Sequence, residues 1–315
     1  MKAAVIYPDN STPRYIDLPD PVRQGEDEVM ISVKAVAIKH FDRSRASGKH
    51  YSSDVAPTPR IIGGDGVGLL EDGTRVYAIG VSGMLAEKAI VSLDRIVPLP
   101  ATLDDATAAA LPNAVIGAAM GLRFKADVQP GDTVLINGAT GFTGRMAVQI
   151  AKHYGAGKVI ATGRNPESLQ ELLSIGADEV IPLDEAFSTR LVGMSFDVVI
   201  DYLWGQSAEA ILASIKGNGR FTNRIRYVSV GSMTGDKIEL SAAGLRSVDL
   251  QLSGSGMGAW SKAQVGQLLR HILPEMFELA AAGKLKVNTT TARIEDIAGL
   301  WNMDVAGGQR LVVLV

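Results

Sequence analysis

Thr133-Val-Leu-Ile-Asn-Gly-Ala-Thr-Gly-Phe-Thr-Gly144 decides the fold, because in it an apolar run enters a turn that holds three glycines. Gly138, Gly141 and Gly144 follow the spacing Gly-x-x-Gly-x-x-Gly. Glycines let the main chain turn tightly and approach phosphates, and the N–H groups and positive dipole end of a following helix favour negative charge. The stretch therefore predicts a strand, a turn and a helix that bind the pyrophosphate of a dinucleotide.

The residues after the turn strengthen this interpretation, since three spaced glycines arise by chance in a chain with 34 glycines. Gly155 supplies a helix stop, and Lys158-Val-Ile-Ala-Thr162 is typical of a second strand. Apolar side chains recur at helical spacing between the two strands, at Met146, Ala147, Ile150, Ala151 and Tyr154. The result is one strand–helix–strand unit.

The second predicted strand ends at Gly163-Arg164-Asn165, where an NAD-binding chain would place an Asp or Glu against the ribose. The planar, permanently charged guanidinium of Arg164 suits the 2′-phosphate of NADP instead. We therefore expect NADPH as the cofactor. In the alternative interpretation Arg164 is simply solvated and Asn165 caps a helix begun by Pro166, and the two interpretations are compatible.

Length and composition narrow the class of protein. The 315 residues suggest about two domains, and the formal charge of −3 comes without a basic run, so we expect no nucleic-acid partner. No stretch of the sequence reaches the apolar length of a membrane span. The apolar stretch among the first residues is too short for a signal peptide, so we expect a cytoplasmic protein. The chain has no cysteine, and its four histidines do not show metal-ligand spacing.

The order of the predicted elements indicates an α/β fold with a β-rich front and a doubly wound parallel sheet behind it. The front contains short β-like runs at 2–7, 29–38, 66–70, 74–79 and 86–91. Six strands alternate with helices in the middle, at 134–136, 159–162, 180–182, 198–201, 227–230 and 250–253. Beyond Ser261 an amphipathic helical stretch with a kink or break at Pro274 leads to a closing strand at 310–315.

Short motifs recur over nearly the whole length of the chain, at 35–38, 42, 47–48, 63–68, 71–76, 83–87, 111–114, 129–136, 147–152, 176–178, 197–201, 230–232 and 254–256. In these motifs the chain resembles the medium-chain dehydrogenase/reductase superfamily and, more narrowly, its zinc-free quinone oxidoreductases and related enone reductases. The resemblance implies a GroES-like catalytic domain at 1–115 and 257–315 and a Rossmann NADP-binding domain at 116–256.

The resemblance also bears on zinc and on the reaction. The positions that match the zinc ligands of alcohol dehydrogenases in this superfamily are Lys39, Gly64 and Asn113, which do not make a plausible zinc site. It therefore implies hydride transfer from NADPH to a quinone, or to the β-carbon of an α,β-unsaturated ketone or aldehyde, that works by orientation and desolvation without a metal.

Candidate site residues follow from the motifs. For the cofactor they are Gly138, Ala139, Thr140, Gly141, Phe142, Thr143, Gly144, Gly163, Arg164, Asn165, Val230, Gly231, Ser232, Gly254, Ser255 and Gly256. The last six are small residues that would leave room for flat rings, or glycines that merely end strands.

Candidate catalytic residues lie in the loop that should border the substrate. Lys39 stands where the related reductases usually carry Asn, and either stabilises an enolate, holds a cofactor phosphate or is a surface lysine. His40 is a possible proton donor, with a packing or surface role favoured, and Tyr51 is a proton donor or a hydrophobic wall. At the position of Gly117, the related reductases often carry Thr.

Two other functions stay open on the sequence alone. The changes at Lys39 and Gly117 are compatible with a non-catalytic NADPH-binding sensor or structural protein, and an enoyl-thioester reductase would show the same motifs. We expect a small-molecule substrate, and the resemblance implies a possible homodimer through the edge of the nucleotide-binding sheet.

Overall fold

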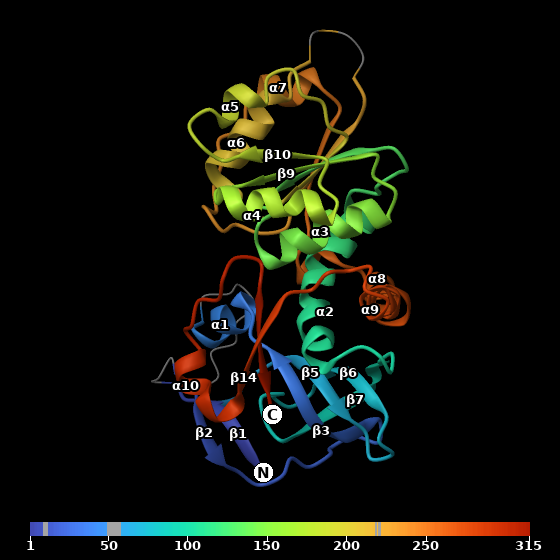
Figure 1. Ribbon diagram of the computed structural model, residues 1–315, viewed down its shortest axis with the longest axis vertical. Coiled ribbons are helices and arrows are strands. Elements are labelled where there is room, and N and C mark those ends of the chain that lie inside the picture. The colour runs from blue at the N-terminus through green and yellow to red at the C-terminus, as the bar shows by residue number, and fades with distance from the viewer. Residues whose placement is uncertain (9–11, 49–57, 218, 220–221) are drawn as a thin grey trace. The chain divides into compact units, whose positions relative to one another are not determined.

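In the computed structural model, which describes residues 1–8, 12–48, 58–217, 219 and 222–315, the chain divides into two compact units. One unit contains Met1–Asn113 and Leu269–Val315, and the other contains Ala114–Leu268. Figure 1 follows the chain through both. The assignment of a catalytic domain to 1–115 and 257–315, and of an NADP-binding domain to 116–256, stays a prediction.

The first unit is built on two β-sheets. The smaller has the order β2-β1-β4, with β1 at Lys2–Ile6, β2 at Arg14–Asp17 and β4 at Arg60–Ile61. The larger has the order β14-β15-β3-β5-β6-β7, with strands at Thr289–Arg293, Arg310–Leu314, Glu28–Ala37, Asp65–Leu69, Arg75–Gly80 and Lys88–Pro98. Because β3 also pairs with β7, the strands β3, β5, β6 and β7 close into a small barrel.

The alternation of side chains along β3 explains its place in the barrel. Ile31, Val33 and Ala35 are buried, whereas Ser32 and Lys34 between them are exposed. A period of two places one set of side chains in the core and the other in solvent. The helices of this unit are α1 (His40–Ala46), α9 (Leu273–Ala281) and α10 (Ile297–Leu300), with a 3₁₀ turn at Ile294–Asp296.

The second unit contains a six-stranded parallel sheet in the order β10-β9-β8-β11-β12-β13. From β8 to β13 its strands are Thr133–Asn137, Lys158–Gly163, Glu179–Pro182, Val198–Asp201, Ile225–Ser229 and Leu250–Gly254. Its helices are α3 (Phe142–His153), α4 (Pro166–Glu171), α5 (Phe187–Arg190), α6 (Gly205–Ser214), α7 (Ala242–Ser247) and α8 (Lys262–Gln267). Two 3₁₀ turns, at Leu172–Ile175 and Met257–Ala259, complete it. This is the doubly wound sheet that the sequence predicts.

The central strands β8, β9 and β11 are buried on both faces. Val134, Leu135 and Ile136 are fully buried, as uninterrupted apolar runs in parallel sheets usually are. Helices α3 and α4 cover one face and α5 and α6 the other (Figure 1). The chain leaves β8 for β9 on one side and later returns to β11 on the other, and ligands of such sheets bind outside the carboxyl ends of the strands at this point.

Two helical stretches run across the boundary between the units. Helix α2 spans Asp105–Met120 and continues as a π-helical segment at Gly121–Lys125. A second π-helical segment, Leu268–Ile272, joins α8 to α9. Pro274 lies in the first turn of α9, directly after this π-helical segment, and the helical stretch continues past the position where the sequence predicts a kink or break.

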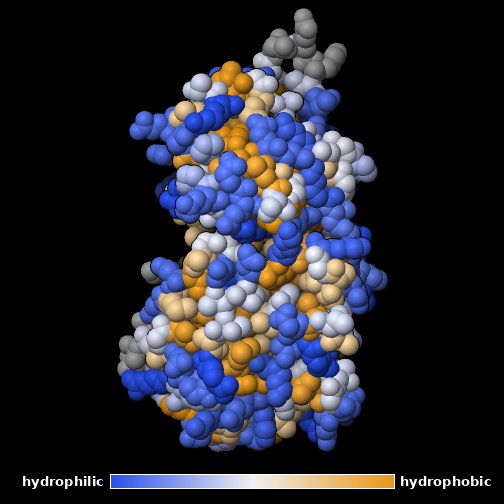
Figure 2. Space-filling model, in the orientation of Figure 1, coloured by the Kyte–Doolittle hydropathy of each residue, from blue (hydrophilic) through white to orange (hydrophobic). Residues whose placement is uncertain are grey.

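The surface is mixed in character. Hydrophilic residues cover most of the face shown in Figure 2, and hydrophobic residues form small groups among them. Of the helices in the described part of the chain, none combines the length and the apolar character that a membrane span needs.

Candidate active site

The glycine turn lies between β8 and α3, as the sequence predicts. Gly138 has a φ of 85°, a conformation that favours glycine. Its N–H donates to Thr162 Oγ1 at 3.1 Å, and the N–H of Ala139 donates to the Thr162 carbonyl at 2.8 Å. These two amides are bonded within the protein, so the donors that suit a phosphate are those of the first turn of α3.

The other two glycines have different geometric roles. A Cβ atom on Gly144 would lie 2.6 Å from both Ala139 Cα and the Gly138 carbonyl, so glycine allows the helix to approach the strand. A Cβ on Gly141 would meet no atom within 4 Å. Gly141 is also the N-cap of α3 and offers no side-chain cap to the helix. Open space in front of an uncapped helix N-terminus fits a pyrophosphate.

Arg164 and Asn165 follow β9 directly. Arg164 is exposed, and the Asn165 Oδ1 accepts a hydrogen bond from the Ser168 N–H at 2.8 Å as the N-cap of α4. The capping role that the sequence predicts for Asn165 is confirmed. A Cβ on Gly163 would collide with the side chain of Thr140, so the end of β9 and the glycine turn are in close contact.

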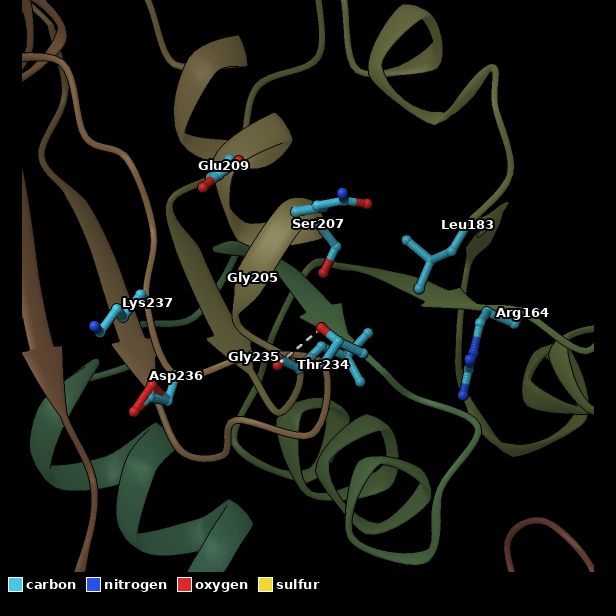
Figure 3. A pocket seen from close by; sticks show the side chains of 11 residues that line it. Arg164, Leu183, Gly205, Ser207, Glu209, Thr234, Gly235, Asp236 and Lys237 are labelled. Atoms are coloured by element: carbon cyan, nitrogen blue, oxygen red, sulfur yellow. Dashed lines mark hydrogen bonds between the residues drawn. The ribbon is translucent and has the colours of Figure 1, made fainter.

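A pocket of about 690 Å³ opens at the carboxyl ends of β9, β10 and β11 (Figure 3). It is lined by Arg164, Leu183, Leu203, Gly205, Gln206, Ser207, Glu209, Thr234, Gly235, Asp236 and Lys237. In the close-up, Arg164 and Leu183 lie on one side, Glu209, Asp236 and Lys237 lie on the other, and Ser207 lies between the two groups. The walls carry charges of both signs and a small apolar surface.

Of the residues that the sequence analysis selected, this pocket contains Arg164. The analysis missed the other ten lining residues. Leu183 and Leu203 come within two residues of the ends of β10 and β11, and the predicted strand ends were the one signal that could have found them.

The small residues expected near the nicotinamide lie after the last two strands of the sheet. The Val230 N–H donates to the Asp201 carbonyl at 2.8 Å, and the Ser255 N–H donates to the Ser229 carbonyl at 2.8 Å. A Cβ on Gly231 would lie 2.7 Å from the Tyr202 carbonyl. Ser232 is exposed, and Gly254 and Gly256 flank the buried Ser255. Their contact with a cofactor stays a prediction.

Lys39 lies in a buried ionic cluster of the first unit. Its side chain is 2% exposed, its Nζ contacts the Asp65 carboxylate, and Asp42 Oδ2 lies 3.4 Å away. The Tyr77 hydroxyl donates to the other Asp65 oxygen at 2.9 Å. Burial alone would lower the pKa of Lys39, but the two aspartates offset burial and hold the pKa above its usual value. The surface interpretation of Lys39 is therefore wrong.

The remaining candidate donors differ in what the structure shows of them. His40 is exposed at the start of α1, and partial burial, together with Arg43 and Arg310, lowers its pKa. Asp42 accepts a hydrogen bond from the Lys39 N–H at 3.0 Å and so ties down the first turn of α1. Tyr51 lies outside the described residues.

Comparisons with a family model and with known proteins indicate the class of protein to which the chain belongs. Residues 143–273 match the family model described as zinc-binding dehydrogenase. The chain is 30% identical over 349 aligned residues to a probable NADPH-dependent quinone reductase, tdiC, of Emericella nidulans, and covers 96% of each sequence. It is 34% identical over 197 residues to a chloroplastic NADPH-dependent alkenal/one oxidoreductase of Arabidopsis thaliana, covering 56% of this chain and 50% of that one.

A solved structure agrees over the whole chain. The quinone oxidoreductase of Thermus thermophilus, also solved with NADPH, superposes with a TM-score of 0.78 at 26% identity and complete coverage of both chains. The chain belongs to the medium-chain dehydrogenase/reductase superfamily and is an oxidoreductase. Within that superfamily it falls in the quinone-oxidoreductase-like branch.

The name of the family model raises the question of zinc, and the residues at the matching positions do not fit the ion. The Lys39 ammonium has no lone pair for a metal and is already paired with two carboxylates. Gly64 has no side chain, and Asn113 Oδ1 lies 3.5 Å from the Arg310 guanidinium that donates to it. In the described residues no three His, Cys, Asp or Glu side chains group as ligands.

Proposed function

We propose that this oxidoreductase takes hydride from NADPH and delivers it to a quinone, or to the β-carbon of an alkene conjugated with a ketone or aldehyde, without a metal ion. The observation that carries the proposal is the pocket at the carboxyl ends of β9–β11, with Arg164 in its wall and the glycine turn beside it. The names of the relatives in quinone and alkenal/one reduction support it.

In this proposal the protein holds the cofactor at three places. The main-chain N–H groups in the first turn of α3 bind the pyrophosphate, and Arg164 binds the 2′-phosphate. Residues 230–232 and 254–256 leave room for the nicotinamide ring. The bound nicotinamide is the hydride donor, and the protein contributes orientation and exclusion of water.

In this proposal the Lys39 ammonium is the group that stabilises negative charge on the substrate oxygen. Because Asp42 and Asp65 hold the ammonium in place, it needs no reorganisation when negative charge develops on the substrate oxygen. His40 is exposed and available as a proton donor, and Tyr51 remains a candidate for the same step. Solvent is the third source of the proton.

Two alternatives use the same pocket. A non-catalytic NADPH-binding protein would bind the cofactor without turnover. An enoyl-thioester reductase is compatible with a 30% identical match of 303 residues in a Mycobacterium tuberculosis polyketide synthase subunit, of which the chain covers 13%. The quinone reductase of Emericella nidulans, which matches over 96% of its length, supports the quinone proposal more directly.

We further propose a small-molecule substrate, a cytoplasmic location and a homodimer through the free edge of β13. The exposed Leu252 on that edge strand supports the dimer.

Oxidation of NADPH by the purified protein tests the proposal. The acceptors are a benzoquinone, an α,β-unsaturated ketone, the corresponding aldehyde and crotonyl-coenzyme A. We expect turnover with the quinone or with the two carbonyl compounds, faster than with the thioester. Binding of NADPH without single-turnover hydride transfer to any acceptor would favour the non-catalytic alternative, and turnover with the thioester alone would favour the enoyl-thioester reductase.

A further inference from the structure

A chain of buried hydrogen bonds runs beneath the pocket across four neighbouring strands. Thr162 Oγ1 donates to Asn137 Oδ1 at 2.8 Å, and Asn137 Nδ2 donates to Asp201 Oδ1 at 2.7 Å. The Tyr227 hydroxyl donates to Asp201 Oδ2 at 2.8 Å. All four side chains are fully buried, and in such a buried network each hydrogen bond affects the strength of its neighbours.

Asp201 is the centre of this chain because it also receives main-chain donors. The Leu203 N–H donates to its Oδ1 at 2.9 Å and the Trp204 N–H at 3.1 Å. With Asn137 and Tyr227, four donors converge on one buried carboxylate. Such a carboxylate fixes the turn that follows β11 to the sheet.

The turn that it fixes has an unfavourable backbone conformation. Trp204 has a φ of 61° and a ψ of −156°, a region that is essentially restricted to glycine. Its ring packs edge-on against Tyr227 with 6.3 Å between centroids. On the other side, Thr234 Oγ1 shares its single hydrogen between the carbonyls of Leu203 and Trp204, which lie 3.1 and 3.0 Å away. A strained residue persists where its surroundings hold it from both sides, as they do here.

The strained turn forms one wall of the pocket. A Cβ on Gly138 would lie 2.7 Å from Leu203 Cγ, so Leu203 packs directly onto the glycine turn. Leu203 and Gly205 both line the pocket, whereas Trp204 does not. The side chain of Leu203 therefore depends on the conformation of Trp204, and that conformation depends on Asp201.

We propose that Asp201 is a positioning residue for the adenosine phosphate half of the cofactor. It holds Trp204 in its strained conformation, and this places Leu203 against Gly138 so that the slot for the nucleotide exists before the nucleotide binds. The inference rests on the proposed function in that the ligand is NADPH. It adds a residue that neither touches the cofactor nor takes part in hydride transfer.

Binding of NADPH and of adenosine 2′,5′-bisphosphate to Asp201→Asn, Trp204→Gly and the double variant tests this. In Asp201→Asn we expect both ligands to bind about tenfold more weakly, with kcat at saturating NADPH and the KM of the second substrate within about twofold of the wild type. Because glycine adopts the 204 conformation freely, the same Asp201→Asn change should cost less than about threefold in the Trp204→Gly background. Asp197→Asn, which alters a carboxylate at the start of the same strand, is the matched control.

Hydrogen exchange gives a readout that needs no ligand. The amides of Leu203 and Trp204 should exchange faster in Asp201→Asn than in the wild type, and this difference should shrink when residue 204 is glycine. A wild type that binds neither ligand would overturn the proposed function, and the exchange data would still decide the role of Asp201 in the turn.

Three results would overturn the inference. They are unchanged ligand affinity in Asp201→Asn, an equal loss with Trp and with Gly at 204, and unchanged exchange at Leu203 and Trp204. If Asp201→Asn does not fold, the inference requires that the double variant does, because its turn is no longer strained; two unfolded variants would contradict it.

Discussion

A Cβ atom on Gly117 would lie 2.8 Å from the Cγ2 methyl group of Thr143, which means that the glycine of α2 and the first turn of α3 share one small space. The Tyr202 hydroxyl donates to the Gly117 carbonyl at 2.9 Å and holds this part of α2 in place. Related reductases often have Thr at the position of Gly117. The methyl group of Thr143 explains the glycine here, because it occupies the space that a side chain on residue 117 would need.

This contact predicts that Gly117→Ala destabilises the protein by about 1–3 kcal/mol, because the added methyl overpacks the contact. Thr143→Ser removes the opposing methyl and keeps the hydroxyl. In that background Gly117→Ala should lose its cost and gain up to about 1 kcal/mol from helix propensity. Urea unfolding of the four proteins measures the coupling, and additive effects would rule out the shared space.

Substitutions at Gly141 and Gly144 should have different effects, one on cofactor binding and the other on stability. Gly144→Ala is expected to lower the free energy of unfolding by about 1–3 kcal/mol, since its Cβ meets the main chain of Ala139. Gly141→Ala should change stability by less than about 0.5 kcal/mol but weaken NADPH binding about tenfold, because its Cβ enters the space kept for phosphate. Calorimetric titration and urea unfolding check both. Normal NADPH binding by Gly141→Ala would place the pyrophosphate elsewhere.

Arg164→Ala should weaken NADPH binding by about 1–3 kcal/mol, the range for a charge-assisted hydrogen bond, and leave NADH binding nearly unchanged. Arg190→Ala is the matched control, since Arg190 is an exposed arginine of the same unit that bonds with Asp184. Titration of each variant with both nucleotides gives the result. Equal losses for NADPH and NADH would refute the 2′-phosphate assignment.

Lys39→Met should destabilise the first unit by about 3–5 kcal/mol, because it leaves Asp42 and Asp65 without their buried cation. Since the folded pKa of Lys39 is raised above 10.5, its stabilising effect is fully present below pH 10.5 and is lost as the pH rises through the folded pKa. Guanidinium unfolding across this range measures the difference from the wild type. Lys34→Met, at an exposed lysine of β3, is the control and should change stability little.

His40 should make the protein less stable in mild acid. Its folded pKa is below 6.5, so the unfolded chain binds more protons as the pH falls below 6.5, and the loss is complete below the folded pKa. His40→Gln should therefore flatten the decline of the melting temperature between about pH 7 and pH 5. A variant that declines as steeply as the wild type would show that His40 does not contribute.

The sheet of the second unit was predictable because its central strands β8, β9 and β11 are apolar runs buried on both faces. Strands β2 and β14 were missed, since their side chains are only partly buried and their strand conformation depends on pairing with β1 and β15. Helix α2 escaped the analysis because most of its side chains are buried and no polar face marks a helical period.

Some features of the candidate site were also predictable from the sequence and others were not. Arg164 was predictable because the end of a strand fixes its position, and Asn165 because its capping role is local. The burial of Lys39 was not, since it depends on Asp65, which lies 26 residues further along the chain. The Asp201 network joins side chains from four strands, and no local pattern shows that they meet.

The pairing of the last strand with β3 has a consequence for synthesis. The second unit is one continuous stretch, Ala114–Leu268, so all its contacts can form while the chain is still on the ribosome. In the first unit, residues 35–37 of β3 pair with β15 at Arg310–Leu314. Until β15 has left the ribosome, these residues present an unpaired strand edge. The segment Met1–Asn113, which is translated before the second unit, therefore belongs to the unit that is completed after it.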